Sequence, residues 1–272
     1  MNRVTAARAA RVLHPRTGGR VGEILALYDE TMRRDPAPAA EVRYERVGGV
    51  VRSVGLWNVV LAWDLSDLGA AAAAVAEQAA YARAAGLQLE WKLFDHDSPA
   101  GLAAVLESAG FVADPSETLM VLDLEVSARG GVVPVDGVDV RRVVDAGGVD
   151  DFISVSTAAF GRDDDWKVPS YIESLADSRV QLYVAYRDGH AVSCGQLNVP
   201  VGRAFASMWG GGTVPDQRGL GFYRALVARR ADEARRLGYR YLTTDARATS
   251  RPILERVGFV PLTGITGWVL RP

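Results

Sequence analysis

The sequence predicts an α/β protein built from two copies of one unit. The same order of elements, strand, helix, strand, helix and strand, is expected at 56–124 and again at 204–270. In each copy the second helix ends in the same tripeptide, at Gly110-Phe111-Val112 and at Gly258-Phe259-Val260. These observations favour a tandem repeat. Coincidence within a single larger α/β domain is the alternative.

The first copy follows an N-terminal stretch that contains several arginines. Residues 1–20 are expected to be a tail or a first helix, and the apolar spacing of 21–32 predicts a helix that Asp35-Pro36-Ala37-Pro38 ends. Gly48-Gly49 predicts a hairpin turn. The other elements expected in this copy are strands at 56–65, 87–94 and 118–124 and helices at 69–85 and 99–109.

Between the copies, Glu125 to Gly137 combines glycine and proline with a loss of periodicity, which is typical of a linker. We therefore expect two domains, one at 1–130 and one at 131–272.

The second copy carries two strong local signals. Asp188-Gly189 predicts a hairpin between strands at 180–186 and 191–199. Gly210-Gly211-Gly212 predicts a bulge in the strand at 204–214, with a flexible loop as the alternative. The remaining expected elements are strands at 138–144 and 239–244, a last strand that ends near 270, and helices at 151–160, 171–175, 225–237 and 251–257.

The stretch from Thr213 to Leu226 predicts a strand end, a turn with two glycines and a helix that opens near Gly221. Free amides at a helix N-terminus attract anions, and Arg218 adds a charged donor. The dinucleotide fingerprint fails because Arg224 stands where it needs a third glycine, and no Gly-Lys-Ser/Thr follows for a nucleoside triphosphate. A diphosphate is the ligand that we expect at this turn.

The order Pro-x-x-Arg-Gly-x-Gly between a strand and a helix resembles the acyl-CoA loop of the GNAT superfamily of N-acyltransferases. The stretch from Ser250 to Val260 is similar to the second motif of that family, a short helix that ends in Gly-Phe. The resemblance implies two tandem GNAT-like domains, each a mostly antiparallel twisted sheet flanked by helices. It also implies acetyl-CoA as the acyl donor and an amine as the acceptor.

Only the second copy is expected to bind the donor. The first has no Arg-Gly-x-Gly, and Asp64 and Asp67 would repel a diphosphate, so we interpret it as a degenerate GNAT-like domain. In the family the bulged strand pairs with the pantetheine arm and the loop holds the diphosphate. The implied cofactor contacts are Gly212, Thr213, Val214, Gln217, Arg218, Gly219, Leu220, Gly221, Phe222 and Tyr223, together with Ser250, which is also the expected N-cap of its helix.

The usual proton carriers of the family are missing. The strand before the loop contains no glutamate, and Leu254 stands at the position of the usual tyrosine. Asp245, after the strand at 239–244, is the candidate for a base or an amine anchor, with a turn or cap role as the alternative. Other candidates, each with a structural alternative, are the tyrosines at 183, 223 and 241, the aspartates at 163–165 and Cys194.

Composition narrows the remaining partners. With 272 residues, 49% of them hydrophobic, and a formal net charge of −2, the chain has no global basic field for nucleic acid. Apolar runs are too short for a membrane span, and the N-terminus lacks the features of a secretory signal, so we expect a cytoplasmic location. The sequence contains no cluster of cysteine and histidine residues that would indicate a metal site.

Three functions remain open. The first is an acetyl-CoA-dependent N-acyltransferase acting on a small-molecule or peptide amine. The second is a non-catalytic acyl-CoA-binding sensor or scaffold, which the missing proton carriers favour. The third is a transferase that uses aminoacyl-tRNA, suggested by the arginines of the helix at 225–237, although Asp232 and Glu233 interrupt that basic face. The sequence does not specify the acceptor or the oligomeric state.

Overall fold

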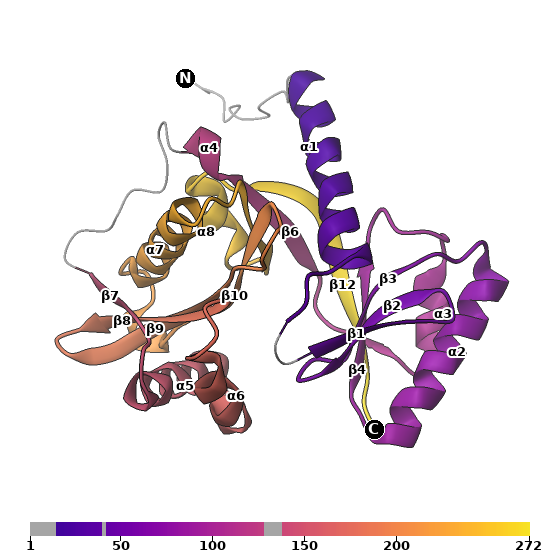
Figure 1. Cartoon of the computed structure of the whole chain (residues 1–272), viewed down its shortest axis with the longest axis horizontal. Helices are drawn as coiled ribbons and strands as arrows, with labels where there is room; N and C mark the ends of the chain where they lie inside the picture. The colour runs from indigo at the N-terminus through magenta and orange to yellow at the C-terminus, as the bar shows by residue number, and fades with distance from the viewer. Residues whose placement is uncertain (1–14, 40–41, 128–137) are drawn as a thin grey trace, which may run out of the picture.

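The predicted α/β class is confirmed in a computed structural model, which describes residues 15–39, 42–127 and 138–272. One mostly antiparallel sheet runs through both halves of the molecule in the order β1-β2-β3-β4-β12-β6-β11-β10-β9-β8-β7, with β5 beside β12 (Figure 1). The strands are β1 (Val42–Val47), β2 (Val50–Gly55), β3 (Val59–Trp63), β4 (Leu89–Phe94), β5 (Val112–Ala113), β6 (Glu117–Asp123), β7 (Asp139–Arg142), β8 (Val180–Arg187), β9 (His190–Asn198), β10 (Phe205–Thr213), β11 (Tyr241–Ala246) and β12 (Val260–Leu270).

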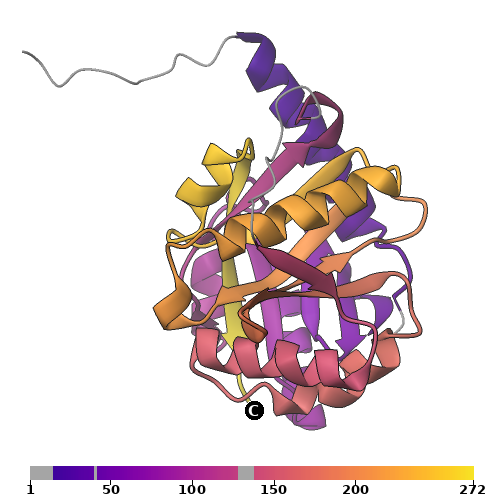
Figure 2. The same ribbon diagram turned by 90° about the vertical axis from the view of Figure 1, so that its left-hand side faces the viewer.

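Helices cover both faces of this sheet. They are α1 (Pro15–Tyr28), α2 (Leu68–Ala85), α3 (Leu102–Ser108), α4 (Leu124–Ser127), α5 (Ala146–Phe160), α6 (Val168–Ser174), α7 (Phe222–Arg236) and α8 (Arg251–Arg256), with a π-helical η1 (Asp29–Arg34) and 3-10 turns η2 (Asp165–Lys167) and η3 (Pro215–Gln217). In the second half, Leu182 packs toward α5 and its neighbour Tyr183 packs toward α7, as the alternation of a strand requires. Helices α5 and α7 therefore lie on opposite faces of the sheet, as Figure 2 shows.

Most elements lie where the sequence places them, with shifted ends. The strand expected at 56–65 is shorter because residues 56–58 form a bend before β3. The side chain of Asn58 accepts a hydrogen bond from the amide of Gly55, and Ser53 Oγ donates to the carbonyl of Trp57. These local bonds compete with the ladder, so pairing to β2 begins only at Val59.

The two halves exchange their last strands. Strand β6, at the end of the first half, pairs along its length with β11 of the second, from Thr118 opposite Ala246 to Asp123 opposite Tyr241. Strand β12, at the end of the second half, pairs with β4 of the first, from Ile265 opposite Phe94 to Leu270 opposite Leu89. Each half therefore completes its sheet with a strand that belongs to the other.

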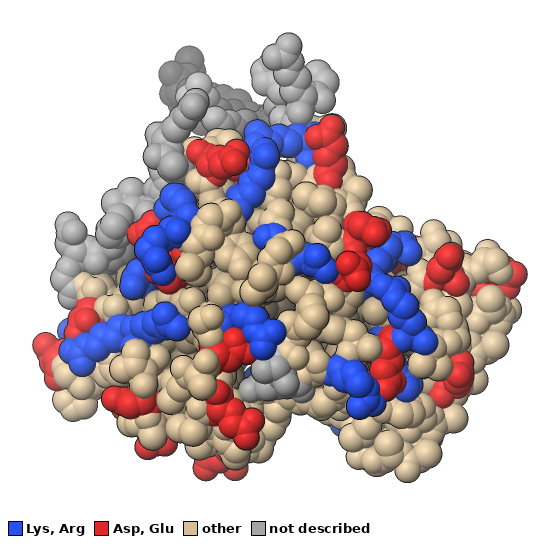
Figure 3. Space-filling view, in the orientation of Figure 1, with Lys and Arg blue, Asp and Glu red and all other residues tan. Residues whose placement is uncertain are grey.

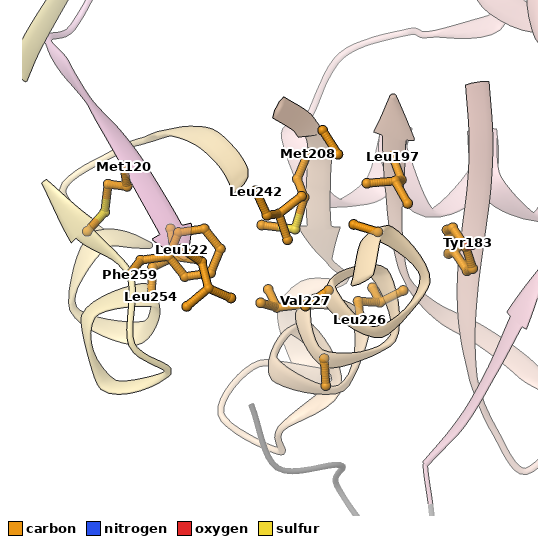
Figure 4. Packing of buried hydrophobic residues seen from close by; sticks show 14 of the residues in the cluster. Met120, Leu122, Tyr183, Leu197, Met208, Leu226, Val227, Leu242, Leu254 and Phe259 are labelled. Atoms are coloured by element: carbon orange, nitrogen blue, oxygen red, sulfur yellow. The ribbon is translucent and has the colours of Figure 1, made fainter. Parts of the chain in front are cut away.

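The exchanged strand β6 is buried on both faces. Its residues Met120 and Leu122 join the core of the second half, beside Leu242 and Val227 (Figure 4). Its alternate residues face the other side of the sheet and join the core under α1, which consists of Ile24, Tyr28, Phe94, Leu119, Val121, Phe205, Tyr241 and Ile265.

The helix expected at 21–32 forms and ends before Asp35, as predicted, but its last turn is the π-helix η1. Arg33 in this turn donates from Nε to the carbonyl of Leu61 in β3 and forms an ion pair with Asp97 at 2.8 Å, so η1 is tied to β3 and to the segment after β4. Residues 1–14 and most of the expected linker at 125–137 lie outside the described residues. Within the described ranges, no helix is long and apolar enough to cross a membrane.

Candidate active site

Strands β10 and β11 run parallel and then separate. They pair only from Phe205 opposite Tyr241 to Ser207 opposite Thr243. Beyond this point β10 stays with β9 and bulges between Trp209 and Gly212, where the register shifts. The predicted bulge is therefore present, and it leaves the β11 side of Gly210 to Thr213 outside the β10–β11 ladder.

The turn that follows β10 presents free amides at the start of α7. Gly219 and Gly221 have φ of 81° and 94°, a region that favours glycine. Within the described residues, the amides of Gly219, Leu220 and Gly221 donate to no backbone carbonyl, and Gly221 provides no side-chain cap for α7. The N-terminus of this 15-residue helix is therefore open to an anion.

Two arginines lie beside this turn. Arg218 donates from Nε to the carbonyl of Thr213 at 3.1 Å and from Nη2 to the carbonyl of Ala159 at 2.9 Å, so it links the end of β10 to α5. Arg187, in the β8–β9 hairpin, donates to Oε1 of Gln217 at 2.8 Å. Both guanidinium groups add positive charge near the open amides.

The corresponding helix of the first half is closed. Asp67 is the N-cap of α2, and its Oδ1 accepts from the amide of Ala70 at 2.9 Å. Hydrogen bonds from the Ala70 amide and the Ser66 hydroxyl hold the pKa of Asp67 below its usual value. A carboxylate thus occupies the place that an anionic ligand would take at this helix end.

The second motif forms the short helix α8, followed by Gly258 with φ of 99°. Ser250 is the N-cap residue of this helix, as expected, but its side chain makes no capping hydrogen bond. Ser250 has helical φ and ψ, so its hydroxyl points back and donates to the carbonyl of Arg247 instead of accepting from the helix amides. Leu254 is buried in the core beside Phe259.

A cleft of about 490 Å³ lies between the two halves. Strands β3 and β4 and the helix α1 line it from the first half, and β9, β10 and α6 line it from the second. Trp209 and Gly210, at the bulge of β10, form part of its wall. Figure 3 shows the notch between the halves on one face of the molecule. The bulged strand and the cleft are therefore contiguous.

Asp245 forms an ion pair with Lys92 across the two halves. The Asp245 side chain is only 4% exposed and that of Lys92 is 13% exposed. Burial acts to lower the pKa of Lys92, but the neighbouring Asp245 and other negative groups outweigh it and leave the pKa raised. The Lys92 ammonium also lies 4.9 Å from the ring centroid of Trp209. This pair therefore adjoins the bulge of β10.

Other residues singled out in the sequence have structural positions. Tyr183 is fully buried and donates to Gln181, and Tyr241 stacks on Phe205. Burial raises the pKa of Cys194 to about 12, so this thiol stays protonated. Asp164 is buried between Lys167 and Ser156 and is not a free anion at the cleft mouth. Tyr223 packs against the backbone of Gly211.

Sequence reasoning missed Tyr28, Glu90 and Lys92 as functional candidates, although all three line the cleft. Burial raises the pKa of Tyr28 to about 12. Glu90 and Lys92 are two residues apart on β4, so they share the face opposite the buried Trp91. The alternation of two charged residues with apolar ones in β4 could have pointed to these candidates. The sequence does not show, however, what the face that carries Glu90 and Lys92 contacts.

Residues 149–259 match the model of the Acetyltransferase (GNAT) family. The second half contains a GNAT domain. No curated protein matches the chain in sequence. The GNAT fold extends to the whole chain, because solved GNAT structures align with 92% or more of it.

Three of these structures show the extent of the likeness. A GCN5-related N-acetyltransferase from Kribbella flavida is 17% identical, with 93% of this chain and 95% of that chain covered and a TM-score of 0.69. A tandem GNAT protein from the clavulanic acid biosynthesis pathway is 16% identical, with the same coverage and a TM-score of 0.61. A GCN5-related N-acetyltransferase from Sphaerobacter thermophilus is 15% identical over 92% of this chain and 86% of that one, with a TM-score of 0.59. The resemblance stated from the motifs is confirmed.

Proposed function

We propose that the protein is an acyl-CoA-dependent N-acyltransferase that transfers an acetyl group from acetyl-CoA to an amine. The observation that carries this proposal is the open N-terminus of α7 next to the bulge of β10, which faces the cleft between the halves. An amide cradle for a diphosphate adjoins a free strand edge for an amide-containing arm, and the same strand lines a cavity for an acceptor at Trp209 and Gly210.

In this proposal the diphosphate lies on the turn and the pantetheine arm runs along β10. The contacts stay those expected from the sequence: Gly212, Thr213 and Val214 for the arm, the seven residues 217–223 for the diphosphate, and Ser250 at the edge of the site. Asp245 stays a candidate catalytic residue, and its carboxylate is paired with Lys92. The domain at 131–272 would bind the donor, and the domain at 1–130, whose α2 is capped by Asp67, would not.

The test is calorimetry with acetyl-CoA. We expect wild-type protein to bind and Arg218→Ala to bind at least about tenfold more weakly, because a charge-assisted contact to phosphate contributes about 1.5–3 kcal/mol. Arg83→Ala is the matched control, since Arg83 also donates to a backbone carbonyl, that of Ala109, but in the first half. Absence of binding to the wild type, or equal weakening by both substitutions, contradicts the proposed site.

A second candidate is a sensor or scaffold that binds acyl-CoA without turnover. It is favoured by the lack of a glutamate on β10 and by Leu254 at the position of the usual tyrosine, while the substitute candidate Asp245 is paired with Lys92. Release of free CoA thiol distinguishes the two functions. Sustained release that depends on an added amine excludes a pure binder, and binding without release for a broad amine panel excludes the enzyme.

A further inference from the structure

The lining of the cleft between the halves is largely apolar and aromatic. Its walls come from both halves, so neither half forms the cavity alone. Aromatic side chains line it from both halves, among them Tyr28, Trp57 and Phe94 of the first half and Tyr171 and Trp209 of the second. An acceptor that fills this cavity buries apolar surface on most sides.

The cationic side chains of the cleft are already paired. Each one contacts a carboxylate within the described part of the chain, so none is left to bind an acidic group on an acceptor. The pairs are Arg33 with Asp29 and Asp97, Lys92 with Asp245, Arg162 and Lys167 with Asp164, and Arg179 with Asp177.

Glu90 is different from these groups. It lines the same cleft from β4, and its side chain forms no hydrogen bond or ion pair with any described residue. Its Oε1 lies over Gly267 of β12, where a Cβ would approach it to 2.8 Å. A carboxylate held in a largely apolar cavity without a partner favours binding of a cation.

The surroundings of Glu90 suit proton transfer. Burial is the main cause that raises its pKa, and the positive charge of Lys92 opposes this effect. Negative charges on Asp245, Glu117 and Asp114 raise it further. A carboxylate with a raised pKa is a stronger base at neutral pH than an ordinary surface glutamate.

We propose that Glu90, supplied by the first half, receives the ammonium group of the acceptor and takes its proton, and that the acceptor is a primary amine on an apolar or aromatic body. This inference rests on the acyltransferase function proposed above. It assigns to the first half a chemical role at the site of the second.

The transfer step balances with Glu90 as the only added base. One ammonium proton moves to the Glu90 carboxylate, and the neutral amine nitrogen then attacks the thioester carbon, forming the C–N bond. When the C–S bond breaks, the electron pair stays on sulfur, and the thiolate takes the second proton that the nitrogen loses. The proton on Glu90 leaves to water as the amide product departs. Asp245 is less suited to this role, because Lys92 holds its carboxylate.

Binding of phenethylamine tests the proposal without requiring turnover. With acetyl-CoA replaced by saturating CoA, calorimetry should show phenethylamine binding to the wild type and at least about tenfold weaker binding to Glu90→Gln. The matched control is Glu117→Gln, since burial also raises the pKa of Glu117, but its carboxylate is bonded to Arg247 and does not line the cleft. Phenylalanine, which adds a carboxylate, should bind more weakly than phenethylamine. Equal binding to wild type and Glu90→Gln, or no binding to the wild type, overturns the proposal.

Turnover assays distinguish the role of Glu90 as the base from the acyltransferase activity itself. With phenethylamine, kcat/KM of the wild type should fall on the acid side as Glu90 becomes protonated. In Glu90→Gln it should be lower by at least about 100-fold and lose this acid limb, while acetyl-CoA affinity stays unchanged. If the wild type turns over phenethylamine and Glu90→Gln keeps the same rate and pH profile, Glu90 is not the base and the acyltransferase stands. If acetyl-CoA does not bind, the proposed function itself fails.

Discussion

At the scale of single residues, the ion pair of Lys92 and Asp245 connects the two halves beside the bulge of β10. Sequence reasoning placed Asp245 just after a strand, whereas it lies within β11 opposite Leu119 of β6. The sequence also could not identify a partner 153 positions away. The pair is nearly excluded from water, so each member depends on the other for compensation of its charge.

Removing one member of this pair should lower the free energy of unfolding strongly, whereas removing both members should lower it only slightly. We expect Asp245→Leu to lower the free energy of unfolding by about 3–5 kcal/mol, because Lys92 is left buried without a counter-charge. The double variant Lys92→Met with Asp245→Leu should recover most of this loss. Urea denaturation of the wild type, both single variants and the double variant measures the coupling. Additive losses would show that the two charges do not depend on each other.

At the scale of elements, the turn from β10 to α7 was the most predictable part of the molecule. Its glycines, its helix start and the bulge before it follow from local sequence, since positive φ and the absence of Cβ are local properties. The hairpin at Asp188-Gly189 was equally predictable from the sequence, and its two central residues have φ of 50° and 79°. Ser250 was placed correctly as the N-cap residue of α8, but its helical φ and ψ replace the side-chain hydrogen bond of an ordinary cap.

Close packing between β10 and α7 should make Gly211 sensitive to a single methyl group. A Cβ there would lie 2.8 Å from Cε2 of Tyr223, in the first turn of α7. We expect Gly211→Ala to displace this turn, weakening acetyl-CoA binding at least about tenfold and lowering the unfolding free energy by about 1–3 kcal/mol. Gly147→Ala is the control, because its Cβ would meet only Asp145 Oδ1 at 3.7 Å. Unchanged affinity in Gly211→Ala would show that the turn tolerates the shift.

At the scale of the whole molecule, the decisive feature is the exchange of β6 and β12. Periodicity predicts a strand at 118–124 and another that ends near Leu270, but the same apolar pattern would suit pairing within either half. The composition of the cleft, the surroundings of Glu90 and the ion pair of Lys92 depend on that pairing. They were therefore not available from the sequence.

The exchange should hold the halves together after the chain is cut. With a protease site inserted between Gly130 and Gly131, we expect the cleaved pieces to elute from gel filtration as one complex and to separate only in denaturant. Residues 131–272 produced alone should not form a stable monomer, because the place beside β11 that β6 fills would be empty. Separate elution of two folded pieces under native conditions would show that the boundary at 130 divides independent domains.

The sheet is continuous from β4 through β12 and β6 to β11. The wall of the cleft from the first half and the wall from the second are therefore parts of one hydrogen-bonded sheet. A domain movement that separates the two walls would break several backbone hydrogen bonds between these strands at once. Trp57, which lines the cleft from the first half, meets Trp166 of the second with ring centroids 5.6 Å apart, and we expect this contact to restrict access to the cleft. The width of the aperture, rather than a hinge, would then limit the size of molecule that this protein can admit.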